Sequence, residues 1–239
     1  MNLLSQLLEE KMMGLKGGLY HQTQIRLAFN SNRIEGSRLS EEQTRYIYET
    51  NTLHLENGDS TANVNDIIET VNHFLCFDYM LDVAREPLSE IQIKEFHRLL
   101  KNGTSDARKT WFRMGEYKSK PNVVGGIETS LPKDVHTDMR NLLNQYHQKE
   151  SVTLQDIVDF HYHFEAIHPF QDGNGRVGRL IIFKECLANN ILPFIIEDEN
   201  KFFYYRGLKE YPRVKEFLTD TCLSEQDDYL KMVEYFTNK

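Results

Sequence analysis

The chain has 239 residues, of which 28 are Lys or Arg and 36 are Asp or Glu, so its formal net charge at pH 7 is −8. Hydrophobic residues make up 40% and charged residues 27%, proportions that argue against a disordered, collagen-like or coiled-coil chain. This length predicts one large domain, or one domain with a helical appendage. The acidic balance argues against a general binder of nucleic acid or acidic membranes, but it allows one local anion site.

The three cysteines, Cys76, Cys186 and Cys222, are widely spaced and form no CxxC pair, which excludes a zinc ribbon and a thioredoxin motif. We therefore expect buried free thiols in a reducing compartment. No apolar run approaches the length of a membrane span. The N-terminal sequence carries Glu9 and Glu10 and lacks the basic start and small-residue cleavage site of a signal peptide. These features predict a cytoplasmic protein that does not bind membranes.

Apolar residues recur with a helical period over most of the chain. A first short helix is expected around residues 3–8, and a second from about Leu19 to Gly36, which is a typical helix stop. Two later helices should open at the capping boxes Ser40–Gln43 and Ser89–Gln92. Between them we expect a turn at Asn57-Gly58-Asp59, followed by a long helix with apolar residues at 64, 67, 68, 71, 74 and 75.

Residues 110–131 interrupt this helical pattern. Gly115, Pro121, Gly125 and Gly126 separate short β-prone pieces, which predicts a hairpin. Helices should resume after Pro132, a residue that suits a first helical turn, and then over about 153–166 and 177–187, with Pro193 as an interruption before the shorter last helices. The predicted fold class is all-α with one small β-hairpin.

Residues 168–179 (HPFQDGNGRVGR) concentrate groups that suit phosphate chemistry. The Gly-Asn-Gly run at 173–175 can adopt positive φ and turn its N–H groups into one concavity. A helix is expected to start there, so the positive end of its dipole favours an anion at the same place. Arg176 and Arg179 would be unfavourable near that helix start by ~0.3–1 kcal/mol each. Their presence there predicts a negative ligand.

Two further residues of this stretch suggest roles in a reaction. Asp172 offers a hard oxygen ligand that suits Mg²⁺. His168 titrates near neutral pH and could act as a general base. Pro169 is expected to place His168 in an extended conformation outside the preceding helix. Taken alone, His168 would more often be a structural histidine and Asp172 a cap residue, so the prediction rests on their combination.

Residues 168–179 match the motif H-x-F-x-[D/E]-G-N-G-R-x-x-R at every specified position, and the chain resembles Fic-domain proteins over about residues 60–215. The resemblance implies a Fic-type helical bundle with a β-hairpin flap, organised as an N-terminal helical region (1–55), a Fic core (56–215) and a C-terminal helix (216–239). It also implies transfer of AMP from ATP to a protein hydroxyl, with auto-modification. Three alternatives stay open: another nucleotide or phosphate donor, removal of AMP, and a non-catalytic interaction domain.

The same resemblance implies a role for each motif residue. His168 would deprotonate the target hydroxyl, Asp172 would hold Mg²⁺ between the ATP phosphates, and Phe170 would anchor the loop in the core. The remaining residues would bind the nucleotide: Gly173, Asn174 and Gly175 at the α- and β-phosphates, Arg176 at the phosphates, Arg179 at the γ-phosphate, and Tyr204 and Tyr205 at the adenine or ribose.

The segment Ser31–Gly36 (SNRIEG) resembles the inhibitory motif [S/T]-x-x-x-E-[G/N] of autoinhibited Fic proteins. Without the downstream motif it would indicate only a helix end with an exposed Glu35. The resemblance implies that Glu35 pairs with Arg179 in place of the γ-phosphate, because a guanidinium binds carboxylate and phosphate oxygens in similar bidentate fashion. Ser31 would support Glu35 by a hydrogen bond.

The hairpin has a role by the same resemblance. Residues of about 118–130 would pair with the main chain of the target as an added strand. The expected partners are therefore ATP, Mg²⁺ and a target protein with a Ser, Thr or Tyr hydroxyl. No nucleic acid or membrane is expected as a partner, and the apolar terminal helices leave a homodimer open.

Overall fold

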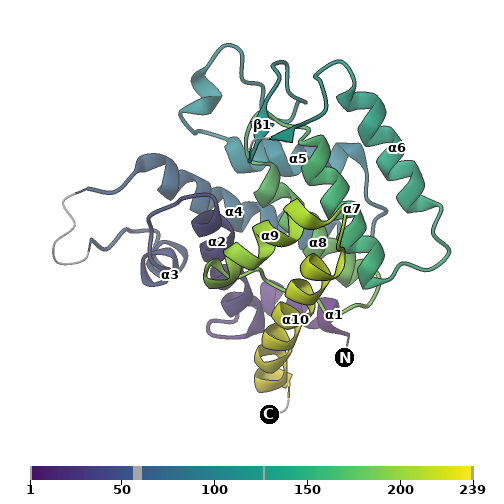
Figure 1. Ribbon diagram of the computed structural model, residues 1–239. Helices are drawn as coiled ribbons and strands as arrows, with labels where there is room; N and C mark the ends of the chain where they lie inside the picture. The colour runs from purple at the N-terminus through teal and green to yellow at the C-terminus, as the bar shows by residue number, and fades with distance from the viewer. Residues whose placement is uncertain (1, 56–60, 126, 238–239) are drawn as a thin grey trace.

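The structure is a computed structural model that describes residues 2–55, 61–125 and 127–237 (Figure 1). In the first half of the chain the helices are α1 (Leu3–Met13), α2 (Leu19–Ile34), α3 (Glu41–Thr50), α4 (Val64–Asp82), α5 (Glu90–Lys101) and the 3₁₀ helix η1 (Asp106–Arg108). In the second half they are α6 (Val135–His147), α7 (Leu154–Ile167), α8 (Asn174–Ala188), η2 (Asp198–Asn200), α9 (Lys201–Glu210) and α10 (Glu216–Thr237). One two-stranded antiparallel sheet, β1 (Val123–Val124) with β2 (Ile127–Glu128), lies between α5 and α6 in sequence. The all-α class with a small hairpin is confirmed.

Most helix boundaries follow the local signals in the sequence. Ser40 and Ser89 both form complete capping boxes, at the starts of α3 and α5, and Thr153 forms a third at the start of α7. α2 ends at Ile34, and Gly36 then takes a left-handed φ of 97°, a conformation that suits glycine. The turn expected at residues 57–59 lies outside the described residues.

Two helix starts differ from the prediction. Pro132 lies in a turn before α6 and not in its first turn, because the N–H groups of Asp134 and Val135 both bond to the Leu131 carbonyl and the helix begins only at Val135. α8 begins at Asn174, within the Gly-Asn-Gly run where the motif predicted a helix start, but three residues before the apolar pattern at 177–187. Its first turn is made of polar motif residues, which apolar periodicity does not detect.

α8 holds the structure together. α8 lies among the other helices in Figure 1 and contacts α2, α4, α5 and α7. Almost every one of its residues is buried. A single apolar cluster extends from Leu4 and Leu7 of α1 through Leu180 and Phe183 of α8 to Tyr229 of α10. This cluster contains residues of all three regions of the expected domain division, which itself stays a prediction. The N-terminus of α8, where the motif lies, is therefore fixed on a rigid support.

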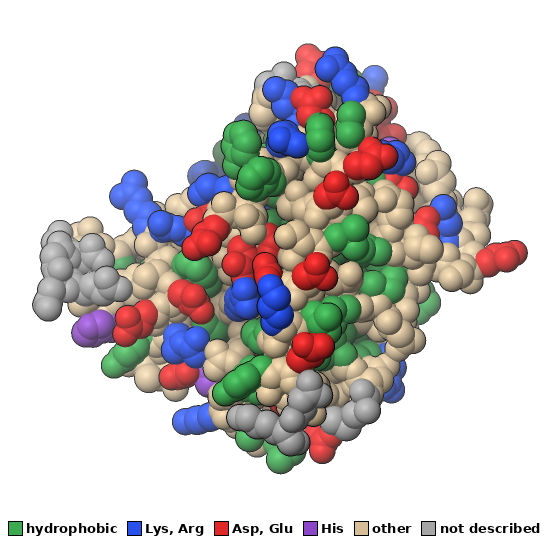
Figure 2. Space-filling view, turned by 60° about the horizontal axis from the view of Figure 1, so that its bottom comes forward, with side chains coloured by type: hydrophobic (Ala, Val, Ile, Leu, Met, Phe, Trp, Pro, Cys, Tyr) green, Lys and Arg blue, Asp and Glu red, His purple; other side chains and the backbone are tan. Residues whose placement is uncertain are grey.

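The surface carries charged side chains of both signs. Figure 2, which turns the bottom of Figure 1 towards the viewer, shows basic side chains interspersed with acidic ones on this face. In the part of the chain that the structure describes, none of the helices is both long and apolar enough to cross a membrane.

Buried histidines make the stability of this fold depend on pH. Burial, as the main cause, lowers the pKa of His73, His97 and His161 to about 3 each. In the unfolded chain they take up protons near pH 6.5, so their contribution to stability is lost as the pH falls below that value. Glu165 and Glu225, with pKa values raised to about 8 and 6 mainly by burial, act in the opposite sense but are fewer.

We therefore expect the free energy of unfolding to fall between pH 7 and pH 5, by at least ~1.4 kcal/mol, the energy of one pKa unit at one site. Urea unfolding at pH 7, 6 and 5 measures this, and constant stability over that range would contradict it. The His97→Gln variant should show a smaller fall than the parent protein.

Candidate active site

His168 lies at the junction of α7 and the loop that leads to α8. It follows the last residue of α7 in a left-handed conformation (φ 51°, ψ 63°), and its N–H donates to the Phe164 carbonyl at 2.9 Å. The expected extended conformation is therefore wrong. Pro169 disfavours a right-handed helical conformation at the preceding residue, but a left-handed residue also ends a helix while its N–H keeps a partner.

The loop between His168 and α8 is fixed by a ring and an amide. Phe170 is fully buried and stacks on the His97 ring, with centroids 4.0 Å apart and planes at 6°. The Asn174 side chain accepts from the Phe170 N–H at 2.8 Å and donates to the Phe170 carbonyl at 2.9 Å. Only Gly173 has positive φ (82°), whereas Asn174 and Gly175 are already helical. Of the three residues that could adopt positive φ, only Gly173 does so, and the helix itself orients the N–H groups of the other two.

The start of α8 forms an anion site. The N–H groups of residues 174–176 have no partner within the helix, since the first helical bond runs from the Val177 N–H to the Gly173 carbonyl. The helix dipole adds about half a positive charge at this end. A Cβ on Gly175 would fall 2.2 Å from Glu35 Oε1. Glycine at this position therefore allows a carboxylate to approach the main chain of the helix.

An ion pair with Arg179 holds the Glu35 carboxylate at the start of α8. Arg179 Nη2 lies 2.7 Å from Glu35 Oε1, and the arginine side chain is only 3% exposed. Its Nε donates to Ser31 Oγ at 3.0 Å and its Nη2 to the Ser31 carbonyl at 2.9 Å. The expected hydrogen bond from Ser31 to Glu35 is thus replaced by bonds that hold the guanidinium. Burial alone would lower the pKa of Arg179, but the Glu35 carboxylate outweighs burial and raises it, so Arg179 stays charged.

Arg176 points into a different group of side chains. Its Nη1 lies 2.5 Å from Glu69 Oε2 and 3.4 Å from Asn32 Oδ1, and its Nη2 lies 3.5 Å from Asp172 Oδ2. The side chain is almost fully buried. Arg176 therefore links α2, α4 and the motif loop, and its contact with a phosphate stays a prediction.

Lys101 is a member of the site that the sequence analysis missed. Its Nζ lies 2.6 Å from Asp172 Oδ2, 2.6 Å from Glu69 Oε1 and 3.1 Å from Asp106 Oδ2, and its side chain is 2% exposed. Burial tends to raise the pKa of Asp172, but Lys101 and then Arg176 lower it to about 2. Asp172 is therefore an oriented carboxylate at neutral pH. The available signal was the position of Lys101 on the apolar face of α5, where a charged residue needs partners.

His168 is neutral at physiological pH. Burial is the main cause and the Lys118 ammonium the next, and together they lower the pKa of His168 to about 4. A neutral imidazole has a free nitrogen lone pair, which a general base requires.

Lys118 connects the hairpin to this histidine. Its Nζ donates to Asn122 Oδ1 and Thr129 Oγ1, each at 2.7 Å, and to the Ile167 carbonyl at 3.2 Å. Its main-chain N–H donates to the Pro169 carbonyl at 2.8 Å. Burial lowers the pKa of Lys118 to about 8. The flap is therefore attached to the residues on both sides of His168, through a lysine that the sequence analysis did not single out.

The two tyrosines of α9 lie at different depths. Tyr204 is 1% exposed, its hydroxyl lies 2.7 Å from His161 Nε2, and its ring centroid is 5.9 Å from Arg179 Cζ. Tyr205 is half exposed and donates to the Ile34 carbonyl at 3.2 Å, at the end of the helix that precedes Glu35. Both lie near the Arg179–Glu35 pair, and their contact with a nucleotide stays a prediction.

The chemistry of the donor set decides how a metal ion could bind. Within the described ranges no group of three or more His, Cys, Asp or Glu side chains could hold a metal by itself. Asp172 is a single half-exposed carboxylate beside the anion site. Mg²⁺ commonly binds through one or two carboxylates together with substrate phosphates, so Asp172 fits that use.

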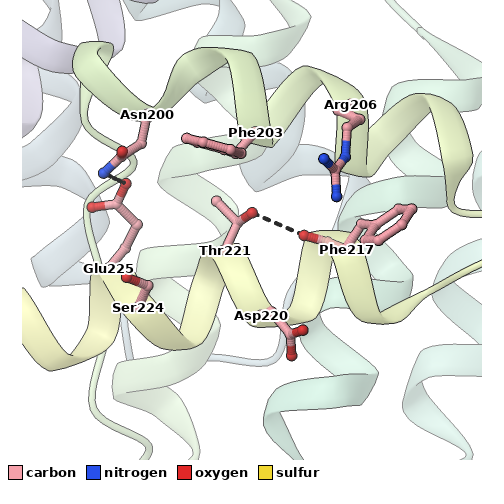
Figure 3. Close-up of a pocket in the computed structure, with 8 residues that line it drawn as sticks. All are labelled: Asn200, Phe203, Arg206, Phe217, Asp220, Thr221, Ser224 and Glu225. Carbon is pink, nitrogen blue, oxygen red and sulfur yellow. Dashed lines mark hydrogen bonds between the residues drawn. The ribbon is translucent and has the colours of Figure 1, made fainter.

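A cavity of about 400 Å³ between α9 and α10 contains none of the motif residues (Figure 3). Within it, Arg206 lies over the Phe217 ring at 4.0 Å from the centroid, Thr221 donates to the Phe217 carbonyl, and Asn200 donates to Glu225. These side chains are engaged with one another, so the residues at the start of α8 remain the better candidate for the site.

The Lys101 contacts generate a stability prediction. Lys101→Met leaves up to three carboxylates without their shared cation, and breaking a buried ion pair in this way typically costs ~3–5 kcal/mol. We expect the free energy of unfolding to fall by about 3 kcal/mol in urea titrations. The matched control is Lys109→Met, which removes an exposed lysine that binds the same Asp106 and should cost less than ~1 kcal/mol. Equal losses in the two variants would contradict this assignment.

Comparisons with known proteins agree with this geometry. Residues 87–185 match the model of the Fic/DOC family. The chain is 26% identical over 195 residues to protein adenylyltransferase fic-1 of Caenorhabditis elegans, covering 80% of this chain and 37% of that protein. It is 26% identical over 186 residues to protein adenylyltransferase Fic of Nematostella vectensis, covering 76% of this chain and 42% of that protein. The chain thus spans about two fifths of the length of these relatives.

Solved structures show the same fold. A Fic domain containing signaling protein from Bacteroides thetaiotaomicron superposes with a TM-score of 0.72 at 24% identity, covering 98% of this chain and 91% of that one. Fic-1 from C. elegans (residues 134–508) superposes with a TM-score of 0.72 at 19% identity, covering 90% of this chain and 64% of that one. The family match includes the His168–Arg179 motif, the helices α5, α6 and α7, and most of α8. Residues 87–185 are therefore similar to the Fic/DOC family, and the chain shares its fold with solved Fic proteins.

Proposed function

We propose that this protein is a nucleotidyltransferase that moves AMP from ATP to a hydroxyl group of a target protein, and that it also modifies itself. The observation that carries the proposal is the Glu35 carboxylate at the start of α8, held by Arg179 and lying against Gly175. An anion already lies where free N–H groups, a helix dipole and a buried guanidinium meet. The names of the relatives, protein adenylyltransferases, support the same reaction.

In the proposed reaction, His168 accepts the proton of the target hydroxyl. The target oxygen forms a bond to the α-phosphorus of ATP, and the bond from that phosphorus to the bridging oxygen of the β-phosphate breaks. Pyrophosphate leaves with the electron pair of the broken bond. The free N–H groups of residues 174–176 stabilise negative charge on the phosphates, as fixed donors do in phosphoryl-type transfers. Arg179 binds the γ-phosphate once Glu35 has withdrawn.

Asp172 is the residue that would hold Mg²⁺. A bound magnesium ion would neutralise phosphate charge and favour departure of pyrophosphate. Lys101 keeps Asp172 ionised and fixes its orientation, so the carboxylate is prepared for a cation before the nucleotide arrives. Arg176, which lies 3.5 Å from the same carboxylate, also favours its ionised form.

Glu35 acts as a built-in inhibitor in this proposal. Its carboxylate occupies the guanidinium that would otherwise receive the γ-phosphate, so ATP could bind only with displaced phosphates. Ser31 supports this state by accepting two hydrogen bonds from Arg179. A hydrogen bond from the Tyr205 hydroxyl to the Ile34 carbonyl also connects α9 to the end of α2. Release of Glu35 is therefore the event that would switch the enzyme on.

The hairpin is the proposed docking surface for the target protein. Val123 and Val124 of β1 are exposed, and an exposed strand can pair with an extended peptide. Lys118 fixes the base of this hairpin to the residues beside His168, which would set the distance between the docked peptide and the base. A homodimer stays a proposal, and the three buried free thiols suit a reducing cytoplasm.

Labelled ATP tests the function directly. With α-³²P-ATP and Mg²⁺, we expect Glu35→Gly to raise label transfer to protein at least ~10-fold over the parent, the effect of removing ~1.4 kcal/mol of inhibition. His168→Ala in the Glu35→Gly background should abolish transfer. Glu150→Gly, which removes an exposed glutamate from the loop before α7, is the matched control and should leave transfer unchanged.

Two results of this assay would decide against the proposal. Transfer of label from γ-³²P-ATP but not from α-³²P-ATP would indicate phosphate transfer instead of AMP transfer. Unchanged activity in Glu35→Gly, with the parent already fully active, would contradict autoinhibition. Release of AMP from a pre-labelled target by the parent, and not by Glu35→Gly, would identify the removal reaction as a second activity.

The metal role has its own test. EDTA should stop AMP transfer by Glu35→Gly, and excess Mg²⁺ should restore it. Adding Asp172→Asn should raise the Mg²⁺ concentration for half-maximal rate at least ~10-fold, since a neutral amide is a weaker ligand for a hard cation than a carboxylate. Asp138→Asn on α6 serves as the control. An unchanged Mg²⁺ requirement in Asp172→Asn would exclude Asp172 as the ligand.

A further inference from the structure

One segment of this acidic chain is basic, and it lies between α5 and β1 at the top of Figure 1. Residues 106–120 hold five Lys or Arg and two Asp or Glu, whereas the whole chain holds 28 and 36. Four of the five basic residues are exposed and have no part in the mechanism given above: Arg108, Lys109, Arg113 and Lys120. Exposed charge that is opposite in sign to the rest of the chain indicates a surface that attracts an anion.

The only tryptophan of the chain lies among these charges. Trp111 is 38% exposed, and two ammonium groups lie near its ring, Lys120 Nζ at 4.6 Å from the centroid and Lys109 Nζ at 5.4 Å. We call these three residues the Trp111 cluster. An aromatic face attracts a cation, but two cations at one ring also repel each other. An anion beside both ammonium groups would offset that repulsion.

The carboxylates of the chain neutralise this cluster only in part. Among the described residues, the Lys120 ammonium has the Trp111 ring and no carboxylate as its partner. Lys109 contacts Asp106, but the same carboxylate lies 3.1 Å from the buried Lys101. Lys109 therefore receives only a share of one negative charge. Charge complementarity favours an acidic partner for this surface over a neutral or basic one.

The Trp111 cluster is attached to the loop that carries the motif. The Lys120 main-chain N–H donates to Gln171 Oε1 at 3.3 Å, and Gln171 is a motif residue. Ser119 Oγ donates to the Trp111 carbonyl at 3.5 Å. β1, the exposed strand proposed to bind the target, begins three residues after Lys120. A peptide that pairs with β1 and presents its hydroxyl to His168 would therefore run close to this cluster.

We propose that the Trp111 cluster binds an acidic side chain, Asp or Glu, of the target protein, within about four residues of the hydroxyl that receives AMP, since an extended strand advances only ~3.3 Å per residue. The indole ring supplies apolar contact area, as tryptophan commonly does at the centre of an interface. The inference rests on the proposed function, because it names the class of target that the same site would select.

Intrinsic fluorescence measures this binding without any transfer of AMP, because Trp111 is the only tryptophan. The probes are capped heptapeptides in which a central serine is flanked by glutamates, by glutamines or by lysines. We expect a saturable change in emission with the glutamate peptide, and a Kd at least ~5-fold higher for each of the other two, a ratio that corresponds to about 1 kcal/mol. Raising the ionic strength to about 0.5 M should weaken the binding, because salt screens exposed charges.

A double variant removes both charges and keeps the fluorescent reporter. Lys109→Gln with Lys120→Gln should raise the Kd of the glutamate peptide at least ~5-fold. The matched control is Lys16→Gln with Lys209→Gln, which removes two exposed lysines from the loop before α2 and from α9 and should change the Kd by less than about twofold. Thermal melts check that each variant is folded, and Lys120→Gln alone replaces the double variant if that one is not.

Kinetics in the Glu35→Gly background measure the specificity itself. The glutamate peptide should show a KM at least ~5-fold below that of the glutamine peptide, with kcat within about twofold, because the Trp111 cluster does not contact the reacting atoms. Lys109→Gln with Lys120→Gln should abolish this difference in KM.

The proposal is overturned if the glutamate peptide gives no saturable change in emission at millimolar concentrations, or if the double variant binds it as tightly as the parent. It is also overturned if ATP or pyrophosphate alone produces the same change and the double variant abolishes that change, since the cluster would then serve the nucleotide. A Glu35→Gly protein that binds the glutamate peptide but transfers AMP to no acceptor would refute the proposed function, while the fluorescence result would still decide the acidic docking surface on its own.

Discussion

A guanidinium group buried at the positive end of a helix needs an anion beside it, and this constraint organises the protein. Arg179 is 3% exposed and lies near the start of α8, where the helix dipole also disfavours a cation. Glu35, the residue that follows α2, supplies the anion from more than a hundred residues earlier in the chain. The same need that keeps the resting state together would create a binding site for a phosphate when Glu35 leaves. Under the proposed function, inhibition and substrate binding would therefore be two ways of satisfying one buried charge.

The other charges of the site follow the same principle. Lys101 and Arg176 share the carboxylates of Glu69 and Asp172, so each of these two cations has an anion within 2.6 Å. This network holds the loop before α8 through Asp172. Phe170 holds the same loop by stacking on His97, and Asn174 holds it by hydrogen bonds to the main chain of Phe170. Lys118 connects the hairpin to the same loop. The residues that would meet ATP and the target thus rest on this network, and His168 lies at its edge in a neutral state.

The helical architecture could be predicted to a large extent from the sequence, because its signals are local. Two capping boxes, the stop after Ile34, and the glycine-rich break that becomes the hairpin all lie where the pattern placed them. Errors arose where a boundary depends on competing local bonds. Pro132 belongs to a turn that forms ahead of α6, and His168 ends α7 in a left-handed conformation that keeps its N–H bonded. Apolar periodicity also missed the first turn of α8, since that turn is polar.

The sequence by itself determined the motif from His168 to Arg179, with its candidate base and its helix start suited to an anion. It also pointed to Glu35 as the acidic residue expected to pair with Arg179. These are properties of residue type and spacing over short distances. Only the tertiary structure decided which partners they have. It showed that Ser31 holds Arg179 and not Glu35, that Lys101 shares Asp172 with Arg176, and that Lys118 joins the hairpin to the residues beside His168. The physical reason is that buried charges and buried hydrogen-bonding atoms are satisfied by whatever neighbours the packing of α2, α4, α5 and α7 around α8 provides, and no local pattern specifies those neighbours.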